Sequence, residues 1–108
     1  MTEDKQSRIK ALFLAYRDSL PSLITELELL WKRLDKKWDE DLAAEFDRKV
    51  HGLAGSAATF ELALIGDAAR ELEHSFKPLL EMNTDDARRK SSEQKLIKLK
   101  QSIEENLS

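Results

Sequence analysis

The chain has 108 residues, a formal net charge of −3 and no cysteine. This length suits one domain, residues 1–108, and is too short for two ordinary ones. Without cysteine there can be no disulfide, thiolate metal site or cysteine nucleophile, and only His51 and His74 are left for a histidine-built metal site. The few aromatic, glycine and proline residues argue against an all-β fold. The mild acidity gives no reason to expect a nucleic acid or an anionic membrane as partner.

The first ten residues are polar, and no apolar run approaches the length of a membrane span. The sequence therefore predicts neither a signal peptide nor a membrane helix. We expect a cytoplasmic protein that binds no membrane, and the lack of cysteine fits that compartment.

A long first helix is predicted over residues 8–35, where apolar residues recur at three- and four-residue steps. Pro21 lies inside this stretch and removes one backbone donor. One interpretation is two separate helices, with Pro21 in the first turn of the second. Because the apolar stripe keeps its phase on both sides, we expect one helix that is kinked near Pro21.

Three further helices follow. Acidic residues 39–41 suit the start of a helix over about 40–60, and a weaker pattern separates it from a third helix over about 63–80. Candidate capping residues at 83–85 precede a fourth helix over about 85–106. Four helices with short connections predict an all-α, antiparallel four-helix bundle in up-down-up-down order.

The second predicted helix carries His51 on the side away from its apolar stripe. At about 100° per residue, the apolar residues fall between about 180° and 260° from the histidine. They are Leu42, Phe46, Val50, Leu53, Ala57 and Phe60. We therefore predict that His51 lies on the outer face of the bundle.

Small residues surround His51 on this outer face, where long polar side chains are usual. Within about 60° of it on the helical wheel lie Ala44, Ala54, Gly55 and Ala58, with Asp47 and Arg48. Gly52 and Gly55 each cost a helix about 1 kcal/mol relative to alanine. A flat surface that a second protein can approach closely would compensate for that cost. The helical wheel alone leaves two other interpretations open. His51 would be an ordinary solvated histidine, or this face would pack on another helix or on a second copy of the chain.

The segment that begins at His51 resembles the histidine-containing phosphotransfer (Hpt) domain family. The family motif reads roughly H-x-L-K-G-S-A, then a large apolar residue and a glycine, and later a Leu-Glu pair. Here residues 51–57 read HGLAGSA, Phe60 is the apolar residue and Leu72-Glu73 is the pair. The chain length and the long first helix with its proline are also similar to the family. Ala54 stands where the family often has lysine, and Glu61 stands where it has glycine.

The resemblance implies that His51 accepts a phosphoryl group from an aspartate on a receiver domain and returns it to one. Three residues would support that group. Arg48 would replace the missing lysine as a cation, Gly55 would leave room beside the imidazole, and Ser56 would lie near by. From the wheel alone Ser56 is a packing or back-bonding residue. The predicted receiver-docking surface consists of Ala44, Asp47, Gly52, Ala54 and Ala58.

The resemblance also implies that this chain binds no cofactor and that Mg²⁺ belongs to the receiver. A hybrid sensor kinase is a further candidate partner. No phosphate-binding loop or kinase signature occurs, so we expect a phosphotransfer intermediate with no ATP-dependent kinase activity of its own. We expect a monomer with no metal site, and a surface position for His74 because no second ligand cluster accompanies it.

The alternative function is a helical adaptor or oligomerisation module without catalysis, including a degenerate Hpt-like fold. Such a module would bind its partner through the small-residue face around His51. Ala54 and Glu61, which depart from the family motif, favour this alternative.

Overall fold

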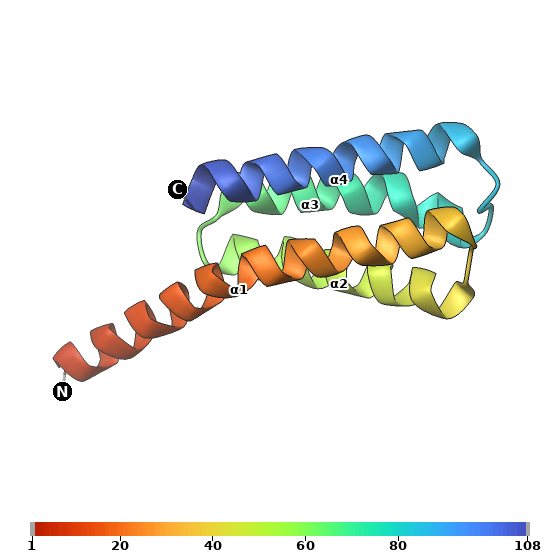
Figure 1. The fold of residues 1–108 in the computed structure, drawn as a ribbon. Helices are drawn as coiled ribbons and strands as arrows, with labels where there is room; N and C mark the ends of the chain where they lie inside the picture. The colour runs from red at the N-terminus through yellow and green to blue at the C-terminus, as the bar shows by residue number, and fades with distance from the viewer. Residues whose placement is uncertain (1, 108) are drawn as a thin grey trace.

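The computed structural model describes residues 2–107, with side chains from residue 5 onward. Four helices form one antiparallel bundle (Figure 1). They are α1 (Thr2–Lys36), α2 (Glu40–Thr59), α3 (Ala63–Phe76) and α4 (Asp86–Leu107), with a 3₁₀ turn, η1 (Lys77–Leu80), after α3. The described residues contain no strand. The predicted all-α bundle with up-down-up-down order is confirmed.

Helix α1 is one continuous helix that contains Pro21, as expected. It begins at Thr2 and not near residue 8, because its polar first turns have good helix formers but no apolar stripe. These turns project beyond the end of the bundle, and the axis bends slightly where the helix joins the other three (Figure 1). Near the proline, the hydroxyl of Thr25 donates to the Pro21 carbonyl at 3.0 Å.

Both ends of α2 are fixed by local hydrogen bonds. Asp39 caps its start, since its Oδ1 accepts from the backbone N–H groups of Asp41 and Leu42 at 2.9 and 3.0 Å. At the other end Leu62 N donates to Ala57 O at 2.8 Å, and Glu61 N donates to Ala58 O at 3.2 Å. This pair of bonds is a Schellman motif, in which the residue after the cap takes a left-handed conformation.

Glu61 is that residue, with φ of 60°. Glycine adopts this region freely, whereas a residue with a Cβ pays about 1–2 kcal/mol. The positive φ therefore explains why the family motif has glycine at this position. Glu61 keeps the same turn at a cost in stability, so this departure from the motif leaves the helix joint intact.

The core is continuous through all four helices and contains a group of packed rings at the end of the bundle away from the N-terminus. Phe46 and Phe76 lie 4.5 Å apart between ring centroids, and Trp31 packs on both. Trp38, in the loop after α1, stacks on Phe76 at 5.9 Å, and the Arg89 guanidinium lies 5.1 Å over its ring. The two tryptophans thus hold the first loop to the bundle.

The α-helix α3 ends at Phe76, earlier than the predicted end near residue 80, and continues as η1. Pro78 lies in the first turn of η1, where its missing N–H is tolerated, and it would break an α-helix. Asp85 then starts α4, since its Oδ1 accepts from Arg88 N at 3.1 Å. Within the residues that the structure describes, no helix is long and apolar enough to cross a membrane.

Candidate functional site

Close packing of α2 on α3 positions the candidate site. Ala54 of α2 is buried, with 4% of its surface exposed, and it faces Gly66 of α3. A methyl group added to Gly66 would lie only 3.5 Å from the Ala54 carbonyl oxygen. The two backbones therefore run close together, and side chains at the outer edge of each helix can reach the other.

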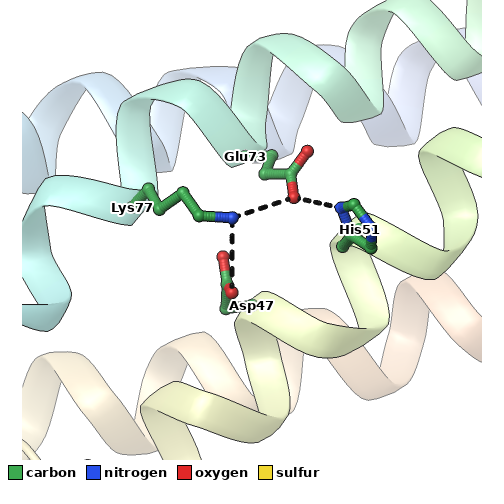
Figure 2. A network of polar contacts seen from close by, with 4 residues as sticks. All are labelled: Asp47, His51, Glu73 and Lys77. Carbon is green, nitrogen blue, oxygen red and sulfur yellow. Dashed lines mark hydrogen bonds and ion pairs between the residues drawn. The ribbon is translucent and has the colours of Figure 1, made fainter.

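His51 lies at this outer edge and contacts Glu73 across the two helices (Figure 2). Its side chain is 73% exposed, while that of Glu73 is only 14% exposed. The imidazole Nδ1 is 2.6 Å from Glu73 Oε2. Because an ionised carboxylate can only accept, Nδ1 carries the hydrogen and donates it. In the neutral ring this tautomer leaves a lone pair on Nε2, which points away from Glu73 in Figure 2.

Lys77 extends the contact into a chain of charged groups. Its Nζ lies 3.4 Å from the same Glu73 oxygen and 3.9 Å from Asp47 Oδ2. The other Asp47 oxygen, Oδ1, is buried and has no hydrogen-bond partner among the described residues. One lysine from η1 thus lies between a carboxylate of α2 and a carboxylate of α3.

Most of the predicted outer face is exposed as expected. Arg48 lies on it with no hydrogen bond or ion pair among the described residues, and the space beside Gly52 and Gly55 is open, since an added Cβ would meet no atom within 4 Å. Ala44 and Ala58 are exposed. Asp47, predicted to line the docking surface, is turned toward Lys77 with 18% of its side chain exposed.

Two of the predicted site residues lie elsewhere. Ala54 is wrong as a docking residue, because α3 covers it. Ser56 is wrong as a residue that supports a phosphoryl group on His51, because it faces α1. Its hydroxyl is 2.7 Å from the Tyr16 hydroxyl, and it back-bonds to the Leu53 carbonyl at 3.4 Å. The packing role that the wheel gave Ser56 is therefore the correct one.

Two residues at the site were missed from the sequence, Glu73 and Lys77. Glu73 was part of the Leu-Glu pair in the family motif, but no role was attached to it. Lys77 lies four residues further on, so the two side chains share a face if the helical phase continues into η1. The four-residue spacing from Glu73 was the signal in the sequence that could have identified Lys77. It did not indicate that either residue lies near His51.

The second histidine, His74, lies on a different face. It lines an open groove between α3 and α4 together with Arg70, Glu71 and Lys95, among others. It is exposed, as predicted, and its side chain has no hydrogen bond or ion pair with any described residue. Among the described residues, no group of three or more potential ligand side chains is placed to hold a metal ion.

In a comparison with protein-family models, residues 11–106 match the Hpt domain. This match covers nearly the whole chain. Neither the curated proteins nor the solved structures provide a match. Hpt domains interact with receiver domains and kinases in phosphorelays. The chain belongs to the Hpt domain family, whose function is histidine phosphotransfer in two-component signalling.

Proposed function

We propose that His51 is the phosphoryl carrier of this domain and that its Nε2 is the accepting atom. The observation that carries the proposal is the 2.6 Å contact between Nδ1 and the Glu73 carboxylate. It selects the tautomer with a free lone pair on Nε2, on a side chain that is 73% exposed. His74 is also exposed but has no such contact, so nothing fixes its tautomer. Exposure alone therefore does not identify the phosphoryl carrier.

The transfer exchanges one bond for another at phosphorus. The Nε2 lone pair attacks the phosphorus of an aspartyl phosphate on the receiver, opposite the leaving oxygen. The Nε2–P bond forms as the P–O bond breaks, and the electron pair of that bond stays with the aspartate as a carboxylate. The hydrogen on Nδ1 is not lost, so the phosphorylated ring carries a positive charge.

Glu73 serves both directions of this reaction. Its carboxylate stabilises the positive ring of the phosphorylated histidine through a charge-assisted hydrogen bond. In the return step an aspartate oxygen attacks phosphorus, and the N–P bond electrons go back to Nε2. A ring that still carries its Nδ1 hydrogen leaves as a neutral imidazole, which is a much better leaving group than an imidazolate anion.

The surface around His51 supports docking of a receiver. Gly52 and Gly55 have open space where other residues carry side chains. A partner can thus approach the α2 backbone beside the imidazole. Ala44 and Ala58 continue this surface, and Arg48, one turn before His51, can turn toward the phosphoryl oxygens. The receiver would supply Mg²⁺, so this chain needs no bound cofactor, and a hybrid sensor kinase would use the same face.

Transfer from a phosphorylated receiver tests the proposal. A receiver domain labelled with radioactive acetyl phosphate is mixed with the wild-type chain, with His51→Gln and with His74→Gln. A known Hpt domain that accepts phosphate from the same receiver is the positive control. We expect acid-labile, base-stable label on wild type and on His74→Gln, and none on His51→Gln. If the control is labelled and the wild type is not, or if His51→Gln is labelled, the proposal is wrong.

The second candidate function is an adaptor that has kept the Hpt shape and binds a receiver without transfer. The observation that favours it is the lack of a lysine at position 54, where a buried alanine packs on α3. The same experiment separates the two functions. An adaptor would bind the receiver, as measured by calorimetry, and would never become labelled.

A further inference from the structure

We propose that Lys77 is a positioning residue for His51, which acts by holding the Glu73 carboxylate on Nδ1 and by offsetting the negative charge of Glu73 and Asp47. The inference rests on the proposed function of His51 and deepens it. Lys77 lies outside the motif that carries the family resemblance, and it comes from η1 and not from the helix that bears the histidine.

The geometry gives Lys77 two simultaneous contacts. Its Nζ is 3.4 Å from Glu73 Oε2, the oxygen that accepts from His51, and 3.9 Å from Asp47 Oδ2 (Figure 2). Both carboxylates are largely shielded from water, with 14% and 18% of their side chains exposed. Shielding strengthens their interaction with a nearby cation compared with fully exposed pairs. Lys77 therefore interacts with two anions that solvent screens only in part.

The end of α3 places this lysine. Lys77 follows Phe76, the last residue of α3, and Pro78 ends the regular helix there. Its side chain then reaches back along the helix to Glu73, four residues earlier, and across to Asp47 on α2. In Figure 2 dashed lines connect Asp47 to Lys77, Lys77 to Glu73 and Glu73 to His51, so the four side chains form one connected chain of contacts.

The charge balance explains why a cation is needed. Asp47 and Glu73 bring two negative charges close to His51, and two uncompensated carboxylates would favour the imidazolium, which has no free lone pair. They would also repel the phosphoryl group on Nε2. Lys77 reduces the charge of the pair from −2 to −1 and leaves Glu73 able to accept from Nδ1. The hydrogen bond then fixes the tautomer of His51 that has its lone pair on Nε2.

Other charged groups near the site do not replace Lys77. On α2, Arg48 is exposed and contacts neither carboxylate, and Lys49 is turned toward α1, where it pairs with Glu26 at 2.8 Å. On α3, Arg70 pairs with Asp67 at 3.6 Å. Of the cations on these elements that the structure describes, Lys77 is the one in contact with both Glu73 and Asp47.

The test is an NMR pH titration of both histidine rings in the chain alone, without phosphate. The variants are Lys77→Met, Lys77→Arg, Asp47→Asn and the double variant Lys77→Met/Asp47→Asn. The Lys77 nitrogen lies within about 6 Å of Nδ1, and loss of one charge at that range shifts a titration by about half a pH unit. We expect the His51 midpoint to rise by about that amount in Lys77→Met and to fall in Asp47→Asn. Lys77→Arg and the double variant should stay close to wild type.

Three controls keep the interpretation unambiguous. The His74 midpoint should not move, and the thermal melts of all variants should stay within a few degrees of wild type. The pH profile of labelling by potassium phosphoramidate should shift with the His51 midpoint. In that reaction the P–N bond to ammonia breaks as the Nε2–P bond forms. If Lys77→Met fails to fold, Lys77→Gln takes its place in the titration.

An unchanged His51 midpoint in a folded Lys77→Met chain would overturn the inference and make Lys77 an ordinary surface ion pair. So would equal shifts in Lys77→Met and Lys77→Arg, because arginine keeps the charge. The outcome is distinct from failure of the proposed function, which concerns receiver transfer. Suppose that Lys77→Met moves the His51 midpoint but no receiver labels His51. This result would support the positioning role of Lys77 and refute the carrier role of His51.

Discussion

The two histidines lie on opposite sides of α3, and they differ in the polar contacts that each ring makes. At the outer edge where α2 packs on α3, His51 donates from Nδ1 to a shielded carboxylate that is itself held by Lys77. In the groove between α3 and α4, His74 is exposed with no partner among the described residues. Nearby acidic and basic residues there pair with one another, as Glu71 does with Lys95 at 3.8 Å.

If the proposed function is correct, an exposed imidazole alone is not sufficient for a phosphoryl carrier. A solvated ring exchanges between its tautomers, so either nitrogen can carry the hydrogen. A ring held at Nδ1 by a carboxylate from another helix presents one nitrogen in one direction. The contact is possible because Ala54 and Gly66 let α2 and α3 approach closely.

The largest expected effect comes from removing each ring in turn. His51→Gln should abolish phosphate labelling by a receiver. His74→Gln should leave it within about twofold of wild type, because the His74 side chain points to another face and makes no hydrogen bond or ion pair with the residues at the first site. The measurement is autoradiography of the chain after transfer. Equal losses in both variants would remove the distinction between the two histidines.

The next effect concerns the carboxylate. Glu73→Ala should slow labelling of His51 by about 10- to 100-fold, by analogy with the loss of a carboxylate that orients a metal-binding histidine. Glu73→Gln keeps an oxygen that can accept from Nδ1 but loses the charge, so its rate should fall between those of Glu73→Ala and wild type. Single-turnover transfer at several pH values measures both. A Glu73→Ala chain that transfers at the wild-type rate would show that the tautomer is fixed in another way.

A matched pair of substitutions tests where the docking face ends. Ala54→Glu buries a carboxylate against α3 and should lower the free energy of unfolding by about 2–4 kcal/mol. Ala58→Glu places the same side chain on the exposed face, so the melt should change by less than about 0.5 kcal/mol while receiver binding weakens. Chemical denaturation and calorimetry separate the two effects. A stable Ala54→Glu chain would contradict the packing of α2 on α3.

The smallest effect lies away from both histidines, at the contact between Tyr16 and Ser56. Burial raises the pKa of Tyr16 above its usual 10.0, and the hydrogen bond to Ser56 lowers it in part. The folded state therefore binds the phenol proton more tightly than the unfolded state. This contribution is fully present below pH 10 and is lost as pH rises above it.

Tyr16→Phe should remove this alkaline loss of stability and cost about 0.5–1.5 kcal/mol at neutral pH through the lost hydrogen bond. It should leave phosphate labelling unchanged, because Ser56 faces α1 and not His51. Denaturation curves at neutral and alkaline pH are the check. A labelling defect in Tyr16→Phe would instead return Ser56 to the phosphoryl site.

The sequence was sufficient for the fold because apolar periodicity and caps act locally. It predicted the outer position of His51 from the phase of one helix, and it predicted the break before the second helix from acidic residues that include Asp39. It missed the first turns of α1, where polar residues form a helix without an apolar stripe. Ala54 was misplaced because it lies at the margin of the wheel, where only the position of α3 decides whether a residue is covered.

The contact between His51 and Glu73 could not be predicted from a helical wheel, for a different reason. It depends on the register of two helices, which is set by the turn at Glu61 and by the close approach at Gly66. The contact of Lys77 depends further on where α3 gives way to η1. Such geometry follows from the packing of the whole bundle, and no single helix contains it.

The assignment of Nε2 of His51 as the accepting atom is tested most directly by long-range ¹H–¹⁵N NMR of the phosphorylated chain. This measurement identifies both the ring and the nitrogen that carries phosphorus, with unmodified His74 as an internal reference. We predict phosphorus on Nε2 of His51, with the hydrogen retained on Nδ1 and coupled to Glu73. Phosphorus on Nδ1 of His51, or on either nitrogen of His74, would contradict the role given to Glu73.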